Sequence, residues 1–591
     1  MADTKREIER KYESNDSGLP DLTGVAGIAA VVDKGVARLD ATYYDTPDER
    51  LAASAITLRR RTGGSDAGWH LKLPVAPGVR DEIRAPLSDR VPRALAGLVR
   101  SRVRDIELIP VVRVVSERDV RDLVDADGRL LAEVGVDAVH AERLAGPGAG
   151  AAAQWSEIEV ELADGGDPAL LDKIDKRLRK AGVRPSRSAS KLARALAETA
   201  PKKAKTRRAS EERASAGKPE KRASVKGASG KRASADGASG KRATAEHAPG
   251  KATVGHAPGK ATVGLAPGKV TVEHTPGKVT VGHAPGQRAR HASPPPPVTA
   301  GEHVLAYVRA QRDALVALDP DVRRDVPDSV HRMRVATRRL RSAFRSYARV
   351  LDRAATDPIG AELKWLAAEL GAGRDQEVLT ERLTAALAGL PRPLVTGPVR
   401  TRLRTWSHAR GGGSRRRLTA VLDGRRYLAL LASLDELLAD PPLRAPARAR
   451  KAGKVVAAAV RKDFGRVAEL VERALALPPG PERDLALHDA RKEAKRTRYA
   501  AEAAVGLLGE PAAGLVLSMR SLQQLLGEHQ DSVMTREALR GLARQAHDAG
   551  ESSFTYGLLY GREERRAAEA EAALPALWET MRGGPVFPGL P

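Results

Sequence analysis

A repetitive stretch in the middle of the chain limits what this sequence can fold into. Between about Ala197 and Pro297 aromatic residues are absent, and Ala, Gly, Ser, Pro and Lys dominate. The stretch contains successive units such as GKATVGHAP, GKATVGLAP and GKVTVEHTP. This composition buries too little apolar surface to offset the entropy lost on folding, and the period is too short for helical solenoid repeats. The sequence therefore predicts a disordered basic linker over residues 199–299, between folded parts at 4–198 and 300–582.

Net charge indicates the kind of partner. The chain contains 100 Lys and Arg against 75 Asp and Glu, a net charge of +25, which predicts a polyanionic partner. Residues 201–300 hold 20 of these basic residues and 6 of the acidic ones, so they contribute +14 of the total. Phosphate binding by the folded parts must depend on where their charges lie. Nucleic acid is a weaker candidate, because aromatic residues are only 3% of the chain and the basic stretches lack interleaved stacking side chains.

Cysteine usage and hydropathy indicate the cellular setting. Cysteine is absent, which excludes disulfides, thiolate nucleophiles and cysteine-bound zinc and is typical of a reducing compartment. The first residues are charged, and no apolar run approaches the roughly 18 to 20 residues of a membrane span. We expect a soluble cytoplasmic protein.

The part before the linker has the alternating pattern of strands. Seven or eight strands are predicted, from segments such as VARLDATYYDT, AITLRRR, GWHLKLP, IPVVRVV, LLAEVGVDAV and WSEIEVEL. Two helical stretches are expected near 88–100 and 168–181. The pattern predicts an α+β domain built on an antiparallel sheet or barrel.

Charged residues share one face of several of these strands. Glu7, Glu9 and Lys11 share a face because alternate residues of a strand point the same way. The same spacing relates two arginines of LRRR, His70 to Lys72, and three glutamates of EIEVE. One such pattern alone is usually a solvated strand face. Repeated over several strands that close into a barrel, it predicts a tunnel lined by charges of both signs.

Such a tunnel suits a phosphate substrate. Carboxylates are the oxygen ligands that Mg²⁺ and Mn²⁺ prefer, while Arg and Lys bind phosphate oxygens. Phosphoryl transfer needs positioned phosphates, a metal ion that bridges their oxygens, and an oriented water. The residues alone therefore predict a metal-dependent phosphate site.

The same motifs together resemble the CYTH family of triphosphate tunnel metalloenzymes. The resemblance rests on EIERK, YYDT, LRRR, WHLK, EIEVE and SKLARAL and covers about residues 4–198. It implies an eight-stranded tunnel that hydrolyses inorganic triphosphate or a related triphosphate with Mg²⁺ or Mn²⁺. It implies catalytic roles for Glu7, Glu9 and Lys11. Metal ligands would be Glu7, Glu9, Glu159 and Glu161, helped by Glu157 and Asp137, and the triphosphate would be bound by Lys11, Arg59, Arg61, Lys72, Arg113 and Lys191.

Three side chains in this part have an uncertain register. VVRVVSERDVR offers several registers for Arg113 and Arg118, and a slip of one residue moves a side chain to the opposite face of the sheet. The same ambiguity affects Glu82 in RDEIR. The family needs no covalent nucleophile, so direct attack by an oriented water is the expected mechanism. Adenylate cyclase and thiamine triphosphatase activities stay open, as does a tunnel that binds without cleaving.

The part after the linker has helical periodicity and an internal repeat. Apolar residues three and four apart predict an all-α domain over residues 300–582. HRMRVATRRLR, which begins at His331, is echoed 157 residues later by HDARKEAKRTR, which begins at His488. Each copy is followed about 40 residues later by a Leu-Gly sequence ending in Asp, LGAGRD or LGEHQD. The repeat predicts two helical bundles related by a pseudo-twofold axis.

Each copy places a histidine and three basic residues on one helical face, at i, i+3, i+7 and i+10. A solvated basic face, or a histidine satisfied in the core, would explain one copy; two copies favour a bound polyanion that relieves the charge repulsion. The motifs resemble the CHAD family, the conserved histidine α-helical domain. The resemblance implies polyphosphate binding without catalysis, by His331, Arg334, Arg338, Arg341, His488, Arg491, Lys492, Lys495, Arg496 and Arg498. The rival interpretation is a non-catalytic polyphosphate-binding scaffold with an inert tunnel.

Overall fold

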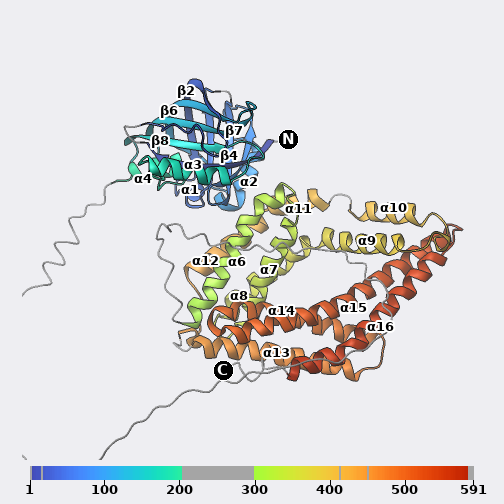
Figure 1. The fold of residues 1–591 in the computed structure, drawn as a ribbon. Coiled ribbons are helices and arrows are strands. Elements are labelled where there is room, and N and C mark those ends of the chain that lie inside the picture. Colours follow the sequence, from blue (N-terminus) through green and yellow to red (C-terminus); the bar gives the residue numbers. More distant parts are fainter. Residues whose placement is uncertain are drawn as a thin grey trace, which may run out of the picture. The chain divides into compact units, whose positions relative to one another are not determined.

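The structure is a computed structural model that describes residues 3–14, 18–64, 66–201, 299–411, 414–448 and 452–583. The predicted linker, 199–299, lies outside these ranges except for its first three residues and its last one. The folded parts before and after it are described separately (Figure 1).

The first part is a closed antiparallel barrel of eight strands within the described residues. The prediction of an eight-stranded α+β barrel is confirmed (Figure 1). Neighbouring strands follow the order β1-β5-β4-β3-β2-β6-β7-β8. The strands are β1 (Asp3–Glu13), β2 (Ala30–Asp45), β3 (Thr57–Thr62), β4 (Gly68–Ala76), β5 (Val79–Ala85), β6 (Ile109–Val124), β7 (Leu130–Arg143) and β8 (Ala152–Leu162).

Apolar side chains cover the outside of the barrel, where helices pack on them. On β8 the apolar Ile158 and Val160 join a buried cluster with Leu170 and Ile174 of α3 (Ala169–Lys180). In the same way α2 (Arg93–Val103) covers β4 and β5. Helix α4 (Lys191–Glu198) instead packs on Val114 and Ala141, which face the same way along β6 and β7 as the inward-facing Arg118 and Asp137, so it lies against the interior face at one end of the barrel. A further short helix is α1 (Arg50–Ala53). Because alternate residues point to opposite faces, packing the apolar residues outward turns the charged ones inward.

The ends of strand β1 are fixed by backbone contacts that also position functional residues. The Glu9 amide donates to the Gly78 carbonyl in the β4–β5 turn over 2.9 Å. Gly78 has φ +73°, and a Cβ there would lie 2.9 Å from the Glu9 carbonyl oxygen, so the close approach requires glycine. Farther along, the Glu13 amide donates to the Arg184 carbonyl and the Ser186 amide to the Lys11 carbonyl. This short pairing brings the chain to Lys191 beside the barrel.

The second part is entirely helical in the described residues, which confirms that prediction. Its helices are α6 (Ala300–Arg323), α7 (Ser329–Ser346), α8 (Arg353–Glu369), α9 (Ala372–Ala388), α10 (Val399–Gly411), α11 (Ser414–Asp423), α12 (Arg425–Ala439), α13 (Ala452–Ala476), α14 (Pro481–Leu508), α15 (Glu510–Asp548) and α16 (Phe554–Gly583), with short 3₁₀ turns at Arg392–Leu394 and Ala445–Arg448. Two apolar clusters form its core; one is built mainly on α6, α7, α8 and α12–α15, the other on α9, α10, α15 and α16. The long helix α15 belongs to both, and Figure 1 shows α14, α15 and α16 running side by side. The repeated motifs lie on α7 and α14, which contact each other.

Candidate functional site

The barrel encloses a cavity of about 280 Å³ lined by charges of both signs. The predicted residues Glu7, Glu9 and Lys11 of β1 lie in its wall. The other predicted residues found there are Arg59, Arg61, Lys72, Glu159, Glu161 and Lys191. The alternation of charged residues along the strands thus brings nearly the whole predicted set into one closed space.

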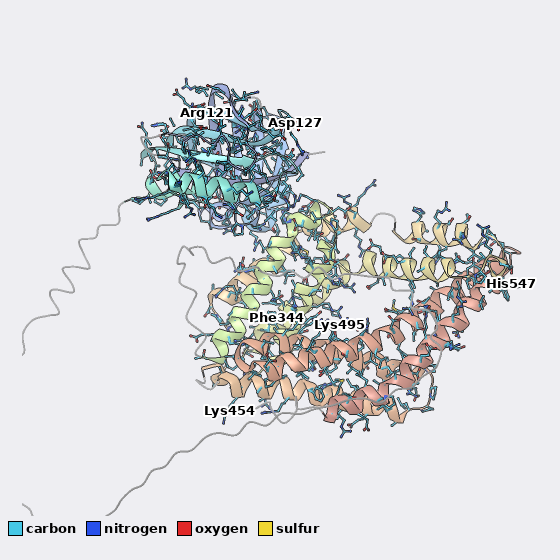
Figure 2. The ribbon with its side chains drawn as sticks, viewed as in Figure 1. Arg121, Asp127, Phe344, Lys454, Lys495 and His547 are labelled. Carbon is cyan, nitrogen blue, oxygen red and sulfur yellow. The ribbon has the colours of Figure 1, made fainter. Side chains whose placement is uncertain are left out.

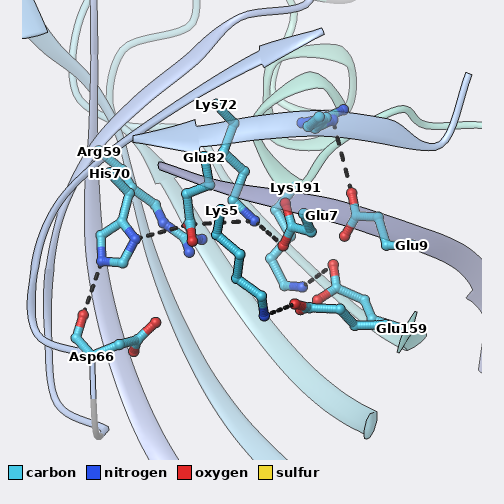
Figure 3. A network of polar contacts seen from close by, with 12 residues as sticks. Lys5, Glu7, Glu9, Arg59, Asp66, His70, Lys72, Glu82, Glu159 and Lys191 are labelled. Atoms are coloured by element: carbon cyan, nitrogen blue, oxygen red, sulfur yellow. Dashed lines mark hydrogen bonds and ion pairs between the residues drawn. The ribbon is translucent and has the colours of Figure 1, made fainter. Parts of the chain in front are cut away.

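Ion pairs connect the two signs of charge inside the cavity. Lys72 Nζ lies 2.5 Å from Glu7 Oε1 (Figure 3). Lys11 Nζ lies 2.9 Å from Glu9 Oε2 and also contacts Glu159. Burial alone would lower the pKa of Lys11, but the carboxylates of Glu159 and Glu9 raise it above its usual value. The lysine is therefore a permanent cation.

Lys191 contacts three carboxylates at once. Its Nζ lies 3.0 Å from Asp137 Oδ2, 2.7 Å from Glu157 Oε1 and 2.7 Å from Glu159 Oε1. Burial opposes ionisation of Glu159, yet the charges of Lys11, Lys191 and Arg118 hold its pKa well below the ordinary range. Lys191 opens helix α4, whose N-cap Ser190 accepts a hydrogen bond from the Ala193 amide over 3.1 Å. A capped helix end thus fixes the lysine at the tunnel wall.

The structure places Arg113 outside the cavity and Arg118 inside it. Arg113 is 51% exposed and pairs with Asp40 on the outer face, Nη2 to Oδ2 at 2.5 Å. Arg118 donates to both oxygens of Asp137, over 2.9 and 2.8 Å, and contacts Glu159. Because 113 and 118 differ by an odd number of residues along β6, only one of them can face inward. The register that was ambiguous in the sequence thus places Arg118, and not Arg113, in the wall of the cavity.

Several lining residues were not among the predicted set. They include Lys5, Tyr43, Arg80 and Arg84; Glu82, whose register was ambiguous in the sequence, also lines the cavity. Lys5 extends the Glu7, Glu9, Lys11 alternation back by two residues, and residues 80, 82 and 84 follow the same rule in VRDEIRA, so period-two spacing alone could have found them. Tyr43 carried no comparable signal, because YYDT contains two adjacent tyrosines.

His70 has a structural role beside the cavity. Its Nδ1 lies 2.9 Å from Glu82 Oε1 and its Nε2 lies 2.9 Å from the Asp66 carbonyl oxygen (Figure 3). Burial lowers the pKa of His70 to about 4, so the ring is neutral near pH 7. A neutral ring has one N–H and can donate it to only one of these two acceptors, so His70 lies beside Glu82 and contributes no positive charge to the cavity.

The second predicted site is a pocket of about 530 Å³ in the helical part. Both copies of the repeat contribute to it: His331, Arg334 and Arg338 from α7, and His488, Arg491, Lys492 and Lys495 from α14. Helices α9 and α15 add Asp375, Arg382, Gln530 and Asp531. The duplicated motifs therefore converge on one basic pocket.

Positive charge in this pocket is only partly compensated. Arg334 forms a bidentate pair with Asp375, at 2.8 and 3.2 Å. Burial, together with the charges of Arg338 and Arg491, lowers the pKa of Lys495 to about 7. The pKa of Arg338 is also lowered, by burial and by neighbouring cations. Such repulsion is what a bound polyanion would relieve.

Three of the predicted helical residues lie outside this pocket. Arg496 lies 3.2 Å from Asp463 Oδ1 and also contacts Glu493. Arg498 lies 2.5 Å from Glu502 Oε1 and donates to Gln523 over 3.2 Å. Arg341 is likewise absent from the residues that line it. The motif is thus divided between a group that lines the pocket and a group beside it.

Comparison with known families matches each folded part to its own family. The CYTH domain matches residues 5–196, and the CHAD domain matches residues 306–540. Two proteins of Mycobacterium tuberculosis, uncharacterized proteins Rv2226 (strain H37Rv) and MT2285 (strain CDC 1551), are each 35% identical over 98% of this chain and 97% of their own length. The chain is a CYTH–CHAD protein. The wider boundaries predicted above, 4–198 and 300–582, stay predictions.

Solved structures with similarity to parts of this CYTH–CHAD protein include PptA from Streptomyces chartreusis, with TM-score 0.40 and 20% identity over 48% of this chain and 99% of that one. The CHAD domain from the plant Ricinus communis gives TM-score 0.37 and 24% identity, over 52% and 99%. The PH1819 protein from Pyrococcus horikoshii gives TM-score 0.21 and 19% identity, over 32% and 97%.

The CYTH tunnel of this chain has the donors for a divalent cation. Glu7 Oε2 is buried without a hydrogen-bond partner, and such an orphaned carboxylate oxygen is a ready cation ligand. Oxygens of Asp137, Glu157 and Glu159 lie within 4.8 Å of one another. Hard oxygen donors of this kind fit Mg²⁺ or Mn²⁺. Among the described residues, no helix is both long and apolar enough to cross a membrane.

Proposed function

We propose that the CYTH domain hydrolyses inorganic triphosphate, or a related triphosphate, with Mg²⁺ or Mn²⁺, and that the CHAD domain binds polyphosphate. The proposal of hydrolysis rests on the composition of the barrel cavity. Carboxylates and basic side chains face one another there, and the basic side chains are the more numerous. A triphosphate needs both kinds of group only if a cation binds with it, because carboxylates alone would repel its oxygens.

Residues of the tunnel divide into two roles under this proposal. Lys11, Arg59, Lys72, Arg118 and Lys191 would hold phosphate oxygens, since each projects a cation into the cavity. The carboxylates Glu7, Glu9, Glu159 and Glu161 would hold the cation. When bound, the cation would neutralise phosphate charge and polarise the bond that breaks.

The attacking group under this proposal is water. The chain contains no cysteine that could serve as a thiolate nucleophile, and the CYTH family needs no covalent nucleophile. The buried lysines and arginines hold the phosphates in place while a carboxylate with a spare oxygen, such as Glu7, orients the water.

The CHAD half of the proposal rests on the excess of cations in its pocket and the absence of a carboxylate cluster among its lining residues. Two aspartates face seven basic or histidine side chains contributed by α7 and α14. This arrangement binds anions but supplies no metal site for cleavage. A cytoplasmic location for both activities remains a prediction.

The decisive experiment measures phosphate release by the full chain from inorganic triphosphate, ATP, thiamine triphosphate and long-chain polyphosphate, with Mg²⁺, Mn²⁺ or EDTA. We expect metal-dependent release from inorganic triphosphate that Glu7→Gln abolishes and Glu142→Gln, an exposed position on β7, leaves unchanged. Formation of cyclic AMP and pyrophosphate from ATP would instead identify a cyclase. Retention of polyphosphate with no release from any substrate would leave a binding scaffold and refute the catalytic half.

A further inference from the structure

A third cluster of polar residues lies away from both sites, where helices α14, α15 and α16 meet. It consists of Asp484 in the first turn of α14, His529 in the middle of α15 and Glu571 on α16. His529 is only 2% exposed. Its sequence neighbours Gln530 and Asp531 line the basic pocket, so His529 is the residue of this segment that points the other way.

The geometry of this cluster brings two carboxylates to one ring nitrogen. His529 Nε2 lies 3.2 Å from Asp484 Oδ1 and 3.2 Å from Glu571 Oε1. One N–H cannot donate a well-aligned hydrogen bond to two oxygens, and both distances are at the long end for N–H···O. They equal, within about 0.2 Å, the ligand-to-ligand separation of roughly 3.3 Å around a tetrahedral ion whose bonds are about 2.0 Å long.

Arginines hold the far oxygens of the same carboxylates. Arg483 Nε lies 3.2 Å from Glu571 Oε2, and Arg536 Nη2 lies 3.8 Å from Asp484 Oδ2. Both contacts are ion pairs without hydrogen-bond geometry, and the other oxygen of each carboxylate faces His529. Outer contacts of this kind fix the ligands of metal sites in position.

We propose that Asp484, His529 and Glu571 bind a transition-series divalent cation that links α14, α15 and α16. One imidazole nitrogen with two carboxylate oxygens is a donor set for Zn²⁺, Mn²⁺ or Co²⁺ and is too nitrogen-rich for a site devoted to Mg²⁺ or Ca²⁺. The three residues lie on separate helices, so the cation stabilises the packing of the bundle. Since α15 also carries the wall of the basic pocket, the cation fixes that wall in place.

The test uses Co²⁺, whose visible absorption reports the coordination of nitrogen and oxygen ligands, added to the full chain. Every sample carries Glu7→Gln and Glu9→Gln, which removes two carboxylates of the tunnel; Asp137, Glu157 and Glu159 remain in every sample, so the readout is the difference that depends on His529. We expect the parent to bind Co²⁺ with a visible absorption band, and His529→Gln to bind one equivalent fewer or at least about tenfold more weakly. The matched control is His547→Gln, an exposed histidine on the same helix (Figure 2), which should bind as the parent does.

A second variant guards against loss of folding. Asp484→Asn with Glu571→Gln retains the size of both side chains and the histidine, and it should lose the absorption band while its far-ultraviolet circular dichroism is unchanged. Co²⁺ should also raise the melting temperature of the parent more than that of either variant. Absence of the band in the parent, or equal Co²⁺ binding by His529→Gln and His547→Gln, would overturn the proposal.

Discussion

The CYTH tunnel and the CHAD pocket balance positive charge in different ways. In the tunnel each of Lys11, Lys72 and Lys191 contacts at least one carboxylate. In the pocket Lys495 faces other cations, and its pKa falls to about 7 because of burial and that repulsion. Buried charges are tolerated when they are paired, as in the tunnel, whereas Lys495, which is buried among other cations, shifts its pKa instead. Under the proposed function, the paired carboxylates of the tunnel would hold a metal ion, and the cations of the pocket would bind a polyanion.

The largest effect that this contrast predicts is a loss of stability when a lysine side chain of the tunnel is removed. Lys191→Met leaves Asp137, Glu157 and Glu159 without their shared partner, so the barrel should lose about 3 kcal/mol of stability. Hydrogen–deuterium exchange of strands β7 and β8 in urea measures the loss. Mn²⁺ should restore part of it, because the three carboxylate oxygens already lie within 4.8 Å of one another.

Lys180→Met is the control for that measurement, since Lys180 is exposed at the end of α3. It should change neither the exchange of β7 and β8 nor its response to Mn²⁺. Equal stability of Lys191→Met and the parent would mean that the carboxylates are not held ionised by this lysine, and the contrast between tunnel and pocket would fail.

The second prediction compares two arginines of one strand. Arg118→Gln should lower phosphate release by about 100-fold, because it removes a buried cation from the proposed phosphate-binding wall. Arg113→Gln should change it by less than about twofold, because that side chain pairs with Asp40 outside the barrel. Steady-state release from inorganic triphosphate measures both. The reverse order of effects would show that β6 has the other register.

Most of the fold and much of the site could be predicted from periodicity, and the misses have geometric causes. Alternation identified Glu7 and Glu159 as inward-facing residues, but it cannot choose between Arg113 and Arg118, whose register depends on pairing with β2 and β7. Lys191 lies on a helix whose approach to the barrel depends on tertiary contacts, so only the family resemblance indicated it.

On the helices, prediction from residue spacing is limited by distance along the helix axis as well as by the direction in which a side chain points. Arg341 and Arg498 stand ten residues after His331 and His488, which is about 15 Å along a helix, and both lie beyond the pocket. Arg496 follows His488 by eight residues and has rotated to the side of the helix that faces Asp463. Regular spacing on a helix predicts the direction in which the side chains point. The size of the cavity then decides how many of them line it.

The third prediction tests the pocket by salt dependence. Arg338→Gln together with Arg491→Gln should weaken binding of long-chain polyphosphate by about tenfold and lower the slope of log affinity against log salt by about 2. Arg426→Gln, at an exposed arginine of α12 that pairs with Glu362, should change neither value. Fluorescence anisotropy of labelled polyphosphate at several salt concentrations provides the measurement. An unchanged slope in the double variant would exclude the pocket as the binding site.

The smallest predicted effect is a pH dependence of polyphosphate binding carried by Lys495 (Figure 2). Burial and the charges of Arg338, Arg491, Arg334 and Arg498 lower the pKa of this lysine to about 7 in the free protein. A bound polyanion favours the charged form, so the complex holds more protons than the free protein above pH 7. Binding should therefore weaken as pH rises, by about threefold over one unit centred on 7.

The variant Lys495→Met isolates this contribution. Other titratable groups face the pocket, namely His331, Asp375, His488 and Asp531. The pKa of His488 is lowered, chiefly by burial, and the pKa of Asp531 is raised by burial. All four groups remain in Lys495→Met, so any pH dependence they cause remains in its binding profile. The threefold change should be present in the parent and absent from the variant. Identical pH profiles for the parent and the variant would mean that Lys495 is already charged in the free pocket. The repulsion between cations that distinguishes this pocket from the tunnel would then be much weaker than their burial indicates.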